Sequence, residues 1–330
     1  MADSHYPEYT AVIRTLGKAG EKFESEINSL RAQSVRPQQI LAYIPDGYEI
    51  PVFPGSEVVR WIRSPKGMVT QRSLPFDEVE TEYILFLDDD VYLPPEGAEK
   101  LLRTAIRENA DAVVPNTFPN SEGSLKWKLR NMGQGALPSF SKKWAFRVRH
   151  STYYNYCNHP DPVMPTQSGA GPCALVRFSA YKAIRFEEER WIEFCGYPLG
   201  EDLLFFNKLH QCGYKVFAQF DTGITHLDAG SGHAADREKQ FRLAEAVRYI
   251  LWHRISYSTA GSGASRLYRS ACYHSTQWAM WMLDLVRFAV TGNPYKMRNR
   301  FAGMRQGKQF TKTPEYTSLP KFNAHTRPRH

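Results

Sequence analysis

The sequence predicts an α/β protein built on a doubly wound, largely parallel sheet. Strand-like and helix-like segments alternate between residues 9 and 115, and the continuous apolar run at 83–87 is typical of a strand buried on both faces. Three carboxylates, Asp88, Asp89 and Asp90, follow that run directly. Ligands of open α/β sheets bind at the carboxyl ends of strands, and adjacent carboxylates need a compensating cation or ordered donors. The triplet therefore indicates a site for a metal-bridged anionic ligand such as a nucleotide diphosphate.

Apolar runs and the glycine and proline residues between them assign the elements in order. The sequence predicts strands at 9–15, 39–44, 58–63, 83–87, 112–114, 174–178 and 214–220. It predicts helices near 23–30, after Pro94-Pro95, and at 203–211 between Gly200-Glu201-Asp202 and Cys212-Gly213. This alternation is typical of βαβ units.

Composition and charge restrict the class of protein. The 330 residues are 42% hydrophobic and 13% aromatic, which is typical of a folded chain, and the net charge of +8 suits an anionic partner. No nucleic-acid-binding module is recognisable, so we expect no nucleic-acid partner. The five cysteines show no Cys-x-x-Cys spacing, which favours a reducing compartment. Neither a signal peptide nor an apolar run of about 18 residues is visible, so we expect a cytoplasmic protein, soluble or peripheral on the inner membrane face.

The chain is expected to have three parts. Residues 1–235 form a catalytic domain, interrupted at 119–168 by a basic, aromatic excursion too long for an idle connection. Residues 236–310 form a helical basic region, and 311–330 a mobile tail. One apolar helical stripe in the second part consists of Trp278, Trp281, Met282, Leu285, Val286 and Ala289. With the cations around it, this stripe is expected either to pack on the catalytic domain or to contact a membrane through 240–310.

Several motifs together resemble a known family. They are Gln33-x-x-x-Pro37-Gln38-Gln39-Ile40 with the following Pro-Asp-Gly turn, Gly67-x-x-x-Gln71-Arg72-Ser73, the Asp-x-Asp pattern of Phe86-Leu87-Asp88-Asp89-Asp90, Gly200-Glu201-Asp202, and His226. Over residues 9–230 the chain resembles a family 2 glycosyltransferase of the GT-A fold, of the kind that builds bacterial polysaccharides. The resemblance implies inverting transfer of a sugar from a nucleotide-sugar, most often a UDP-sugar, to a saccharide or lipid-linked acceptor in surface polysaccharide or glycolipid synthesis. A retaining transferase on the same fold is a further alternative.

The resemblance also implies roles for residues at the donor. Asp90 would bind Mn²⁺ or Mg²⁺ and His226 would complete the metal shell, since Mn²⁺ accepts an imidazole as well as carboxylates. The cation would neutralise the charge that develops on the departing diphosphate. The remaining residues expected at the donor are Thr15, Asp46, Arg72, Asp88 and Asp89. The family often has Pro-Thr-x-Asn-Arg after its first strand and Asn at position 73, so Arg14-Thr15-Leu16-Gly17-Lys18 and Ser73 leave uracil recognition open.

Asp202 is the expected general base. An inverting transfer needs a carboxylate to accept the acceptor's hydroxyl proton, and the first turn of a helix favours a negative charge. The alternative is that Glu201 and Asp202 are an acidic pair that only stabilises the helix. Glu201 and Trp191 are expected at the acceptor, although Trp191 also suits a core position.

Two other functions compete with glycosyl transfer. A phosphatase of the haloacid dehalogenase type also has Asp-x-Asp after an apolar strand. It usually carries that motif near the start and a second Asp four residues after the Gly-Asp pair, where this chain has Phe206. The other alternative is a non-catalytic relative that binds sugar or nucleotide, against which the presence of Asp202 argues.

Overall fold

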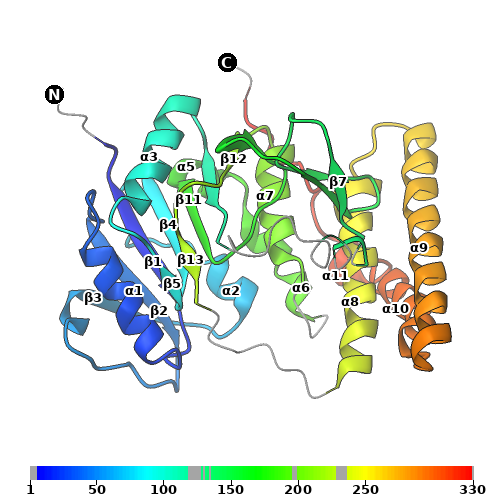
Figure 1. Cartoon of the computed structure of the whole chain (residues 1–330), viewed down its shortest axis with the longest axis horizontal. Helices are drawn as coiled ribbons and strands as arrows, with labels where there is room; N and C mark the ends of the chain where they lie inside the picture. Colours follow the sequence, from blue (N-terminus) through cyan, green and yellow to red (C-terminus); the bar gives the residue numbers. More distant parts are fainter. Residues whose placement is uncertain are drawn as a thin grey trace.

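The computed structural model describes residues 6–117, 128, 131–133, 135–194, 199–227 and 236–328. Its centre is an eight-stranded mixed sheet in the order β10-β12-β6-β11-β4-β1-β2-β3 (Figure 1). The strands of this sheet are β1 (Tyr9–Arg14), β2 (Gln39–Pro45), β3 (Val59–Ser64), β4 (Tyr83–Asp88), β6 (Ala112–Pro115), β10 (Val163–Pro165), β11 (Cys173–Arg177) and β12 (Val216–Gln219). The predicted fold class, a doubly wound α/β sheet with further helices at the C-terminal side, is confirmed.

Strand direction divides the sheet into two halves with a common edge. β1 is parallel to β2 and β4, and β2 is parallel to β3. β12 is parallel to β6 in the other half. Between the halves β11 runs antiparallel to both β4 and β6. The parallel strands of both halves therefore end at the same edge, which is where open α/β sheets bind their ligands.

Helices cover both faces of this sheet. They are α1 (Glu21–Arg31), η1 (Ser56–Val58), α2 (Met68–Arg72), α3 (Gly97–Glu108), α5 (Phe178–Ala183), η3 (Phe186–Glu189), α6 (Trp191–Phe194) and α7 (Glu201–Gln211). Alternate residues of β1 face opposite cores: Ile13 packs with Phe23 of α1, whereas Val12 belongs to the cluster that contains Leu204 of α7. The predicted amphipathic helices thus bury their apolar faces on the sheet.

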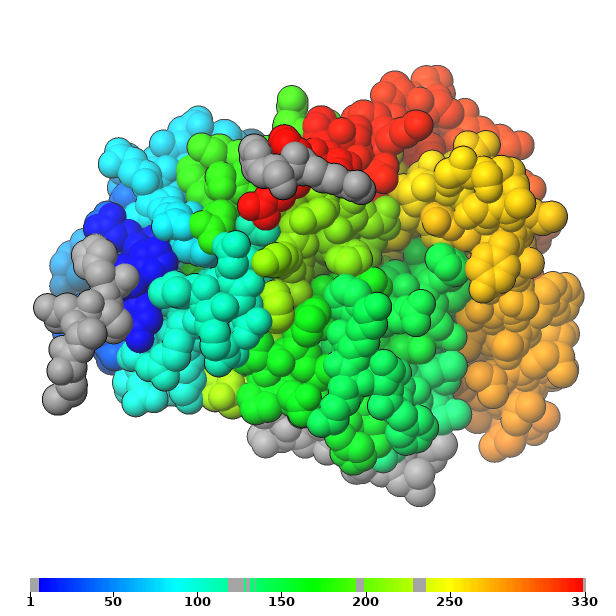
Figure 2. All heavy atoms as spheres, turned by 90° about the horizontal axis from the view of Figure 1, so that it is seen from above, coloured from blue at the N-terminus to red at the C-terminus, as the bar shows by residue number. Residues whose placement is uncertain are grey.

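Two small sheets are added to this frame. The first pairs β5 (Val91–Tyr92) with β13 (Thr225–His226). The second consists of β7 (Leu137–Ser139), β8 (Phe146–Val148) and β9 (Tyr154–Cys157) and lies within the excursion predicted at 119–168, part of which falls outside the described residues. In the space-filling view the green segment that contains these strands lies beside the C-terminal helices (Figure 2).

The C-terminal region contains α8 (Arg237–Trp252), the π-helical turn η4 (His253–Tyr257), α9 (Gly263–Thr291), α10 (Tyr295–Phe310) and α11 (Pro314–Thr317). Val247, Ile250 and Leu251 of α8 share one apolar cluster with α7, so the boundary expected near 236 does not separate two cores. Gly303 and Gly307 let α10 approach α8 closely, since a Cβ at either position would lie 2.4 Å from a carbonyl oxygen of α8. Among the described helices, none has the length and apolarity needed to cross a membrane.

The long helix α9 lies at one end of the molecule, beside α8 and α10 (Figure 1). Gln277 and Asp284 are buried, and both contact the buried Arg300 of α10. Its exposed large hydrophobic residues are Leu267, Tyr268, Trp278, Met282, Leu283, Val286 and Val290. Most of the predicted apolar stripe is therefore not packed against the catalytic domain, because a buried ion-pair network occupies that side.

The expectation of a mobile tail at 311–330 is wrong for its described part, residues 311–328. Phe322 is fully buried and Tyr316 is 7% exposed. Arg327 donates to Asp111 at 2.9 Å, and His325 lies 2.7 Å from Glu188. These contacts attach the segment to the sheet domain at Asp111, just before β6, and at Glu188 of η3. The polar composition of the tail did not predict them.

Candidate active site

The acidic triplet lies where β4 ends at the common edge of the sheet. Asp88 is the last residue of β4, and Asp89 and Asp90 form the turn into β5. Arg14, opposite Asp88 in the β1–β4 register, forms an ion pair with it. The hydroxyl of Thr15 donates to Asp89 Oδ2 at 2.5 Å. Thr15, Asp88 and Asp89 are thus brought together as predicted for one site, and Arg14 is a charged member that the sequence did not mark.

His226 reaches the triplet through the short β5–β13 sheet, in which it lies opposite Val91. Its Nε2 is 2.9 Å from Asp90 Oδ1, and the two side chains are 19% and 7% exposed. The N–H of Leu227 also donates to the Asp90 carbonyl at 2.8 Å. The two residues predicted as metal ligands are therefore neighbours, although they are far apart in the sequence.

A divalent cation fits the chemistry of Asp90 and His226. Within the described part of the chain, no three His, Cys, Asp or Glu side chains are grouped so as to enclose a metal. The protein would then supply a carboxylate and an imidazole, and phosphate and water oxygens would complete the shell, as is common for Mn²⁺ and Mg²⁺. Burial, together with the carboxylates of Asp90 and Asp88, raises the pKa of Asp89. A bound cation would offset this crowding of negative charge.

Asp202, the predicted base, is held by groups from two other segments. Arg72, at the end of α2, forms an ion pair with Asp202 Oδ1, and the N–H of Gly171 donates to Asp202 Oδ2 at 3.0 Å. The same Arg72 donates to the Gly171 carbonyl at 3.1 Å. Arg72 was expected at the donor diphosphate, and its guanidinium contacts the carboxylate of Asp202, which is 32% exposed.

Gly171 makes this arrangement possible because its backbone approaches both partners. A Cβ at residue 171 would lie 1.9 Å from Asp202 Oδ1 and 2.5 Å from Arg72 Nη2. Real Cβ contacts are not that short, so a side chain here would displace the ion pair. Within the glycine-rich segment 169–171, residue 171 must therefore be glycine for the carboxylate of Asp202 to be held in this position.

Glu201 lies beside Asp202 but in a different electrostatic environment. Its side chain is 12% exposed, and its Oε1 is 3.1 Å from Arg72 Nη1. Burial and the carboxylate of Asp202 raise the pKa of Glu201 to about 8, although Arg72 opposes the shift. Burial and the neighbouring carboxylate thus favour the protonated form of Glu201, which can donate a hydrogen bond.

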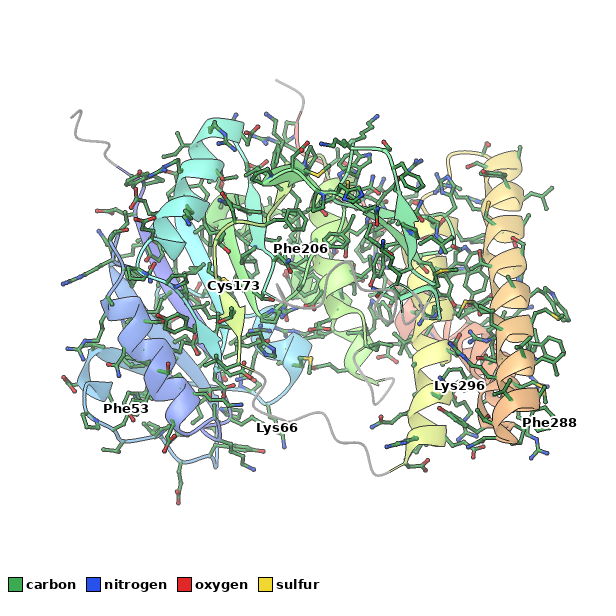
Figure 3. All side chains as sticks on the ribbon, in the orientation of Figure 1. Phe53, Lys66, Cys173, Phe206, Phe288 and Lys296 are labelled. Carbon is green, nitrogen blue, oxygen red and sulfur yellow. The ribbon has the colours of Figure 1, made fainter. Side chains whose placement is uncertain are left out.

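Cations and an aromatic ring follow the ends of β1, β2 and β3. Lys18 and Lys66 lie 5.4 and 5.3 Å from the centre of the Tyr48 ring. Figure 3 labels Lys66 near the lower edge of the sheet, where these strands end. Asp46 is exposed directly after β2, at the same edge. Sequence reasoning missed the three-residue cluster, although each member lies only a few residues beyond a predicted strand.

Trp191 was expected to stack on an acceptor sugar, and the structure corrects this. Trp191 is 2% exposed, its Nε1 donates to Glu189 Oε2 at 2.7 Å, and its ring packs against Phe310 and Tyr316. An indole buried in this way has no face available to a ligand. Trp191 therefore occupies a core position, which was the alternative expected from the sequence.

A cavity of about 640 Å³ opens beside Asp202 over the β6–β12 half of the sheet. Its walls come from the ends of β6 and β12, from β8 and β9, from the start of α7, and from α8. Phe146, Tyr153 and Tyr154 give it an aromatic side, and Asp202 and Arg248 are its charged wall residues. The volume suits a small-molecule ligand, and it lies apart from the β1–β3 ends where the basic cluster is found.

Comparison with known families identifies the domain. Residues 47–185 match the family model described as Glycosyl transferase family 2. This segment is similar to glycosyl transferase family 2, which confirms the resemblance that the motifs predicted. The matched segment includes Arg72 and the acidic triplet, whereas Asp202 and His226 lie beyond its end. The protein is accordingly a glycosyltransferase, as the motifs predicted.

Solved glycosyltransferases resemble the whole fold. The mannosyltransferase PcManGT from Pyrobaculum calidifontis, solved with GDP-Man and Mn²⁺, superposes with a TM-score of 0.51 at 14% identity, over 98% of this chain and 86% of that one. GalNAc-T7, solved with UDP, GalNAc and Mn²⁺, has a TM-score of 0.46 at 11% identity, over 89% of this chain and 60% of that one. At these identities the first likeness supports the GT-A fold of the glycosyltransferase, and the second adds nothing to it. No curated protein sequence matches the chain.

Proposed function

We propose that this glycosyltransferase moves a sugar from a nucleoside-diphosphate donor to a hydroxyl acceptor, with inversion and with a divalent cation. The observation that carries the proposal is the position of Asp202. Its carboxylate lies on the wall of a cavity, is held by Arg72 and Gly171, and belongs to the same sheet edge as the acidic triplet. A base fixed in this way beside an open cavity is what proton removal from an acceptor requires.

The reaction would balance as follows. The acceptor oxygen forms a bond to the anomeric carbon as the bond from that carbon to the diphosphate oxygen breaks, and the electron pair leaves with the nucleoside diphosphate. Asp202 accepts the hydroxyl proton. Asp90 and His226 would hold Mn²⁺ or Mg²⁺, which supplies Lewis-acid neutralisation of the leaving phosphates. Arg14 and Thr15 orient the other two carboxylates of the triplet, Asp88 and Asp89.

The donor nucleotide is proposed to lie over the ends of β1, β2 and β3. The Tyr48 ring and the ammonium groups of Lys18 and Lys66 suit a base and its phosphates. A UDP-sugar is the first candidate from the sequence. GDP deserves equal testing because PcManGT was solved with GDP-Man.

We further propose a peripheral membrane contact through α9 and α10, consistent with synthesis of a surface polysaccharide or glycolipid on the inner membrane face. The two helices contain one acid, Asp284, which is buried with Arg300 as its partner. Their other basic residues are Arg266, Arg269, Arg287, Lys296, Arg298, Arg305 and Lys308. Exposed apolar side chains lie on α9, the helix on which Figure 3 labels Phe288. An apolar face flanked by cations is complementary to an anionic lipid surface.

The phosphatase alternative gains nothing from the fold. Phe206, at the position where that family needs its second Asp, is 2% exposed in the core and is labelled there in Figure 3. A carboxylate could not take its place without burying a charge.

Thermal unfolding with UDP, GDP, CDP and dTDP, each with Mn²⁺ or with a chelator, tests the proposed function. A ligand at about 100 times its dissociation constant stabilises a protein by roughly 2.7 kcal/mol, which is visible as a rise in melting temperature. We expect one nucleotide to give a rise that needs the metal. If no nucleotide changes the melting temperature, the donor site is disproved. A nucleotide response without sugar transfer to any hydroxyl acceptor would favour the non-catalytic alternative.

A further inference from the structure

The cavity beside Asp202 is lined by a second charged residue, Arg248, which has no role in the proposed transfer reaction. Arg248 projects into the cavity from α8, on the side formed by the C-terminal helices. Its side chain is 25% exposed and lines the cavity, while its Nε atom is buried. A cation at this position would attract an anionic group of a ligand in the cavity.

The surroundings of Arg248 leave its charge only partly balanced. Its nearest carboxylate is Glu245, with Arg248 Nε 3.7 Å from Glu245 Oε2. The other oxygen of Glu245 lies 3.0 Å from Arg300, so one carboxylate is shared between two guanidinium groups. Arg300 also pairs with Asp284, and Asp284 in turn pairs with Arg287. Among the described residues, Arg248 therefore shares the carboxylate of Glu245 with Arg300 and has no closer acidic partner of its own.

The rings around Arg248 hold the guanidinium in place without neutralising it. The Arg248 Cζ atom lies 4.4 Å from the centre of the Tyr153 ring, whose hydroxyl accepts a hydrogen bond from Gln277. Although burial opposes it, the nearby tyrosines and Glu245 raise the pKa of Arg248, so the group stays cationic at any working pH. The guanidinium is therefore a fixed, positively charged donor fork.

The remainder of the cavity is apolar and aromatic. Phe146 and Tyr154 are in edge contact with each other, and Phe220 and Leu251 line other parts of the wall. Such walls accept the face of a sugar ring, an aromatic ring or a hydrocarbon chain. Asp202, the other charged wall residue, already has Arg72 as its counter-ion.

From this arrangement we infer that the acceptor carries an anionic group, a phosphate ester or a carboxylate, which Arg248 binds while the acceptor hydroxyl lies at Asp202. The inference rests on the proposed function, because it names the acceptor class for the same cavity. Arg248 is then a specificity-determining residue contributed by α8, and the C-terminal helices form part of the acceptor site. A planar guanidinium suits either anion because both accept two parallel N–H bonds.

Matched probes that differ in charge test the inference by calorimetry, in the presence of Mn²⁺ and the nucleotide that raises the melting temperature. The probes are nitrophenyl glucoside, which is neutral, nitrophenyl glucuronide, which adds a carboxylate, and nitrophenyl phosphate. We expect one or both anionic probes to bind about tenfold or more tightly than the glucoside, as a charge-assisted bond to a guanidinium implies. The stronger anionic probe distinguishes a carboxylate from a phosphate acceptor.

Variants of α8 assign the preference to Arg248. Arg248→Gln should remove the preference for the anionic probes and leave binding of the glucoside unchanged, and Arg248→Lys should restore part of it. Arg242→Gln is the matched control, because Arg242 is exposed on the same helix and does not line the cavity. Equal binding of neutral and anionic probes by the unaltered protein would overturn the inference, as would a preference that survives Arg248→Gln.

The nucleotide response separates this inference from the proposed function. Arg248→Gln should keep the metal-dependent rise in melting temperature, since Arg248 lies on the β6–β12 side and not at the β1–β3 ends. If the unaltered protein shows no such rise, the proposed function has failed. If the rise is present and only the anion preference is absent, the acceptor inference alone has failed.

Discussion

Arg72 and Asp202 form a partly buried ion pair across 130 residues of sequence. Arg72 ends α2, which follows β3, whereas Asp202 lies in the first turn of α7. The backbone of Gly171, just before β11, contacts both side chains. A carboxylate with its orientation fixed in this way needs little reorganisation before it accepts a proton. This relationship, and not the acidic pair alone, distinguishes a candidate catalytic base from a helix-stabilising side chain.

Asp202→Asn should abolish base catalysis and keep donor binding. The amide is nearly isosteric but accepts no proton, so we expect the transfer rate to fall by about 10²–10⁴-fold. The metal-dependent rise in melting temperature with nucleotide should remain. Comparison of the transfer rate with the nucleotide melting response checks both halves, and an unchanged rate would remove Asp202 from the mechanism.

Gly171→Ala should misplace the base without unfolding the protein. The new Cβ would overlap Asp202 Oδ1, and the carboxylate and Arg72 would have to move. Displacement of a catalytic group by about 1 Å can cost about a hundredfold in rate, which is the loss we expect in kcat. Gly261→Ala is the control, because a Cβ at residue 261 meets nothing within 4 Å. Equal rates for the two variants would contradict the role of the Gly171 contact.

Glu201→Gln should flatten the dependence of stability on pH. The folded-state pKa of Glu201 is raised to about 8, so between about pH 4.5 and 8 the folded protein holds a proton that the unfolded chain has released. The free energy of unfolding therefore falls as pH rises through this window, and replacing the acid by a neutral amide removes that loss. Melting temperatures from pH 5 to 9 measure the effect, with the exposed Glu80→Gln as a control. A variant that follows the pH dependence of the unaltered protein would show that Glu201 ionises normally.

Asp90→Asn and His226→Ala should each weaken metal-dependent nucleotide binding. Their side chains are 2.9 Å apart, so either change removes one of the two protein ligands proposed for the cation. We expect a loss of several kcal/mol in transition-state stabilisation for Asp90→Asn. Titration of Mn²⁺ against a fixed nucleotide concentration should show a weaker metal midpoint in both variants. Midpoints identical to that of the unaltered protein would assign the metal to other residues.

The outward face of α9 should bind vesicles that contain phosphatidylserine. The double change Trp278→Ser and Val286→Ser removes two apolar side chains that are 56% and 59% exposed, and we expect vesicle binding to fall by about tenfold. Val52→Ser is the control, since Val52 is 90% exposed elsewhere on the molecule. Sedimentation with anionic and neutral vesicles measures the effect. Dimerisation that depends on Trp278, without vesicle binding, would assign the face to a second copy of the chain.

Local pattern in the sequence predicted seven of the eight strands of the central sheet and missed β10, which lies within the excursion at 119–168. Continuous apolar runs predicted these strands, and apolar residues repeating with a period of 3.6 predicted α1, α3 and α7. Both patterns indicate which residues are buried in the fold. The acidic triplet could be placed at a ligand-binding edge because it directly follows the apolar run 83–87. Thr15 and Asp89 were expected at the donor from the family resemblance, and each ends or follows a predicted strand.

Contacts between distant segments had no local signal. The sequence placed Arg72 at the diphosphate, but the ion pair with Asp202 depends on where α2 and α7 meet. The periodicity of α9 showed one apolar and one polar side, and only the buried partners of Gln277 and Asp284 decided that the polar side faces inward. Trp191 is an aromatic residue near the acidic pair in sequence, yet core packing withdraws it from any ligand. Period and composition indicate how apolar one face of a helix is. Which other segment packs against that face depends on the free energy of long-range packing and of pairing between buried charges.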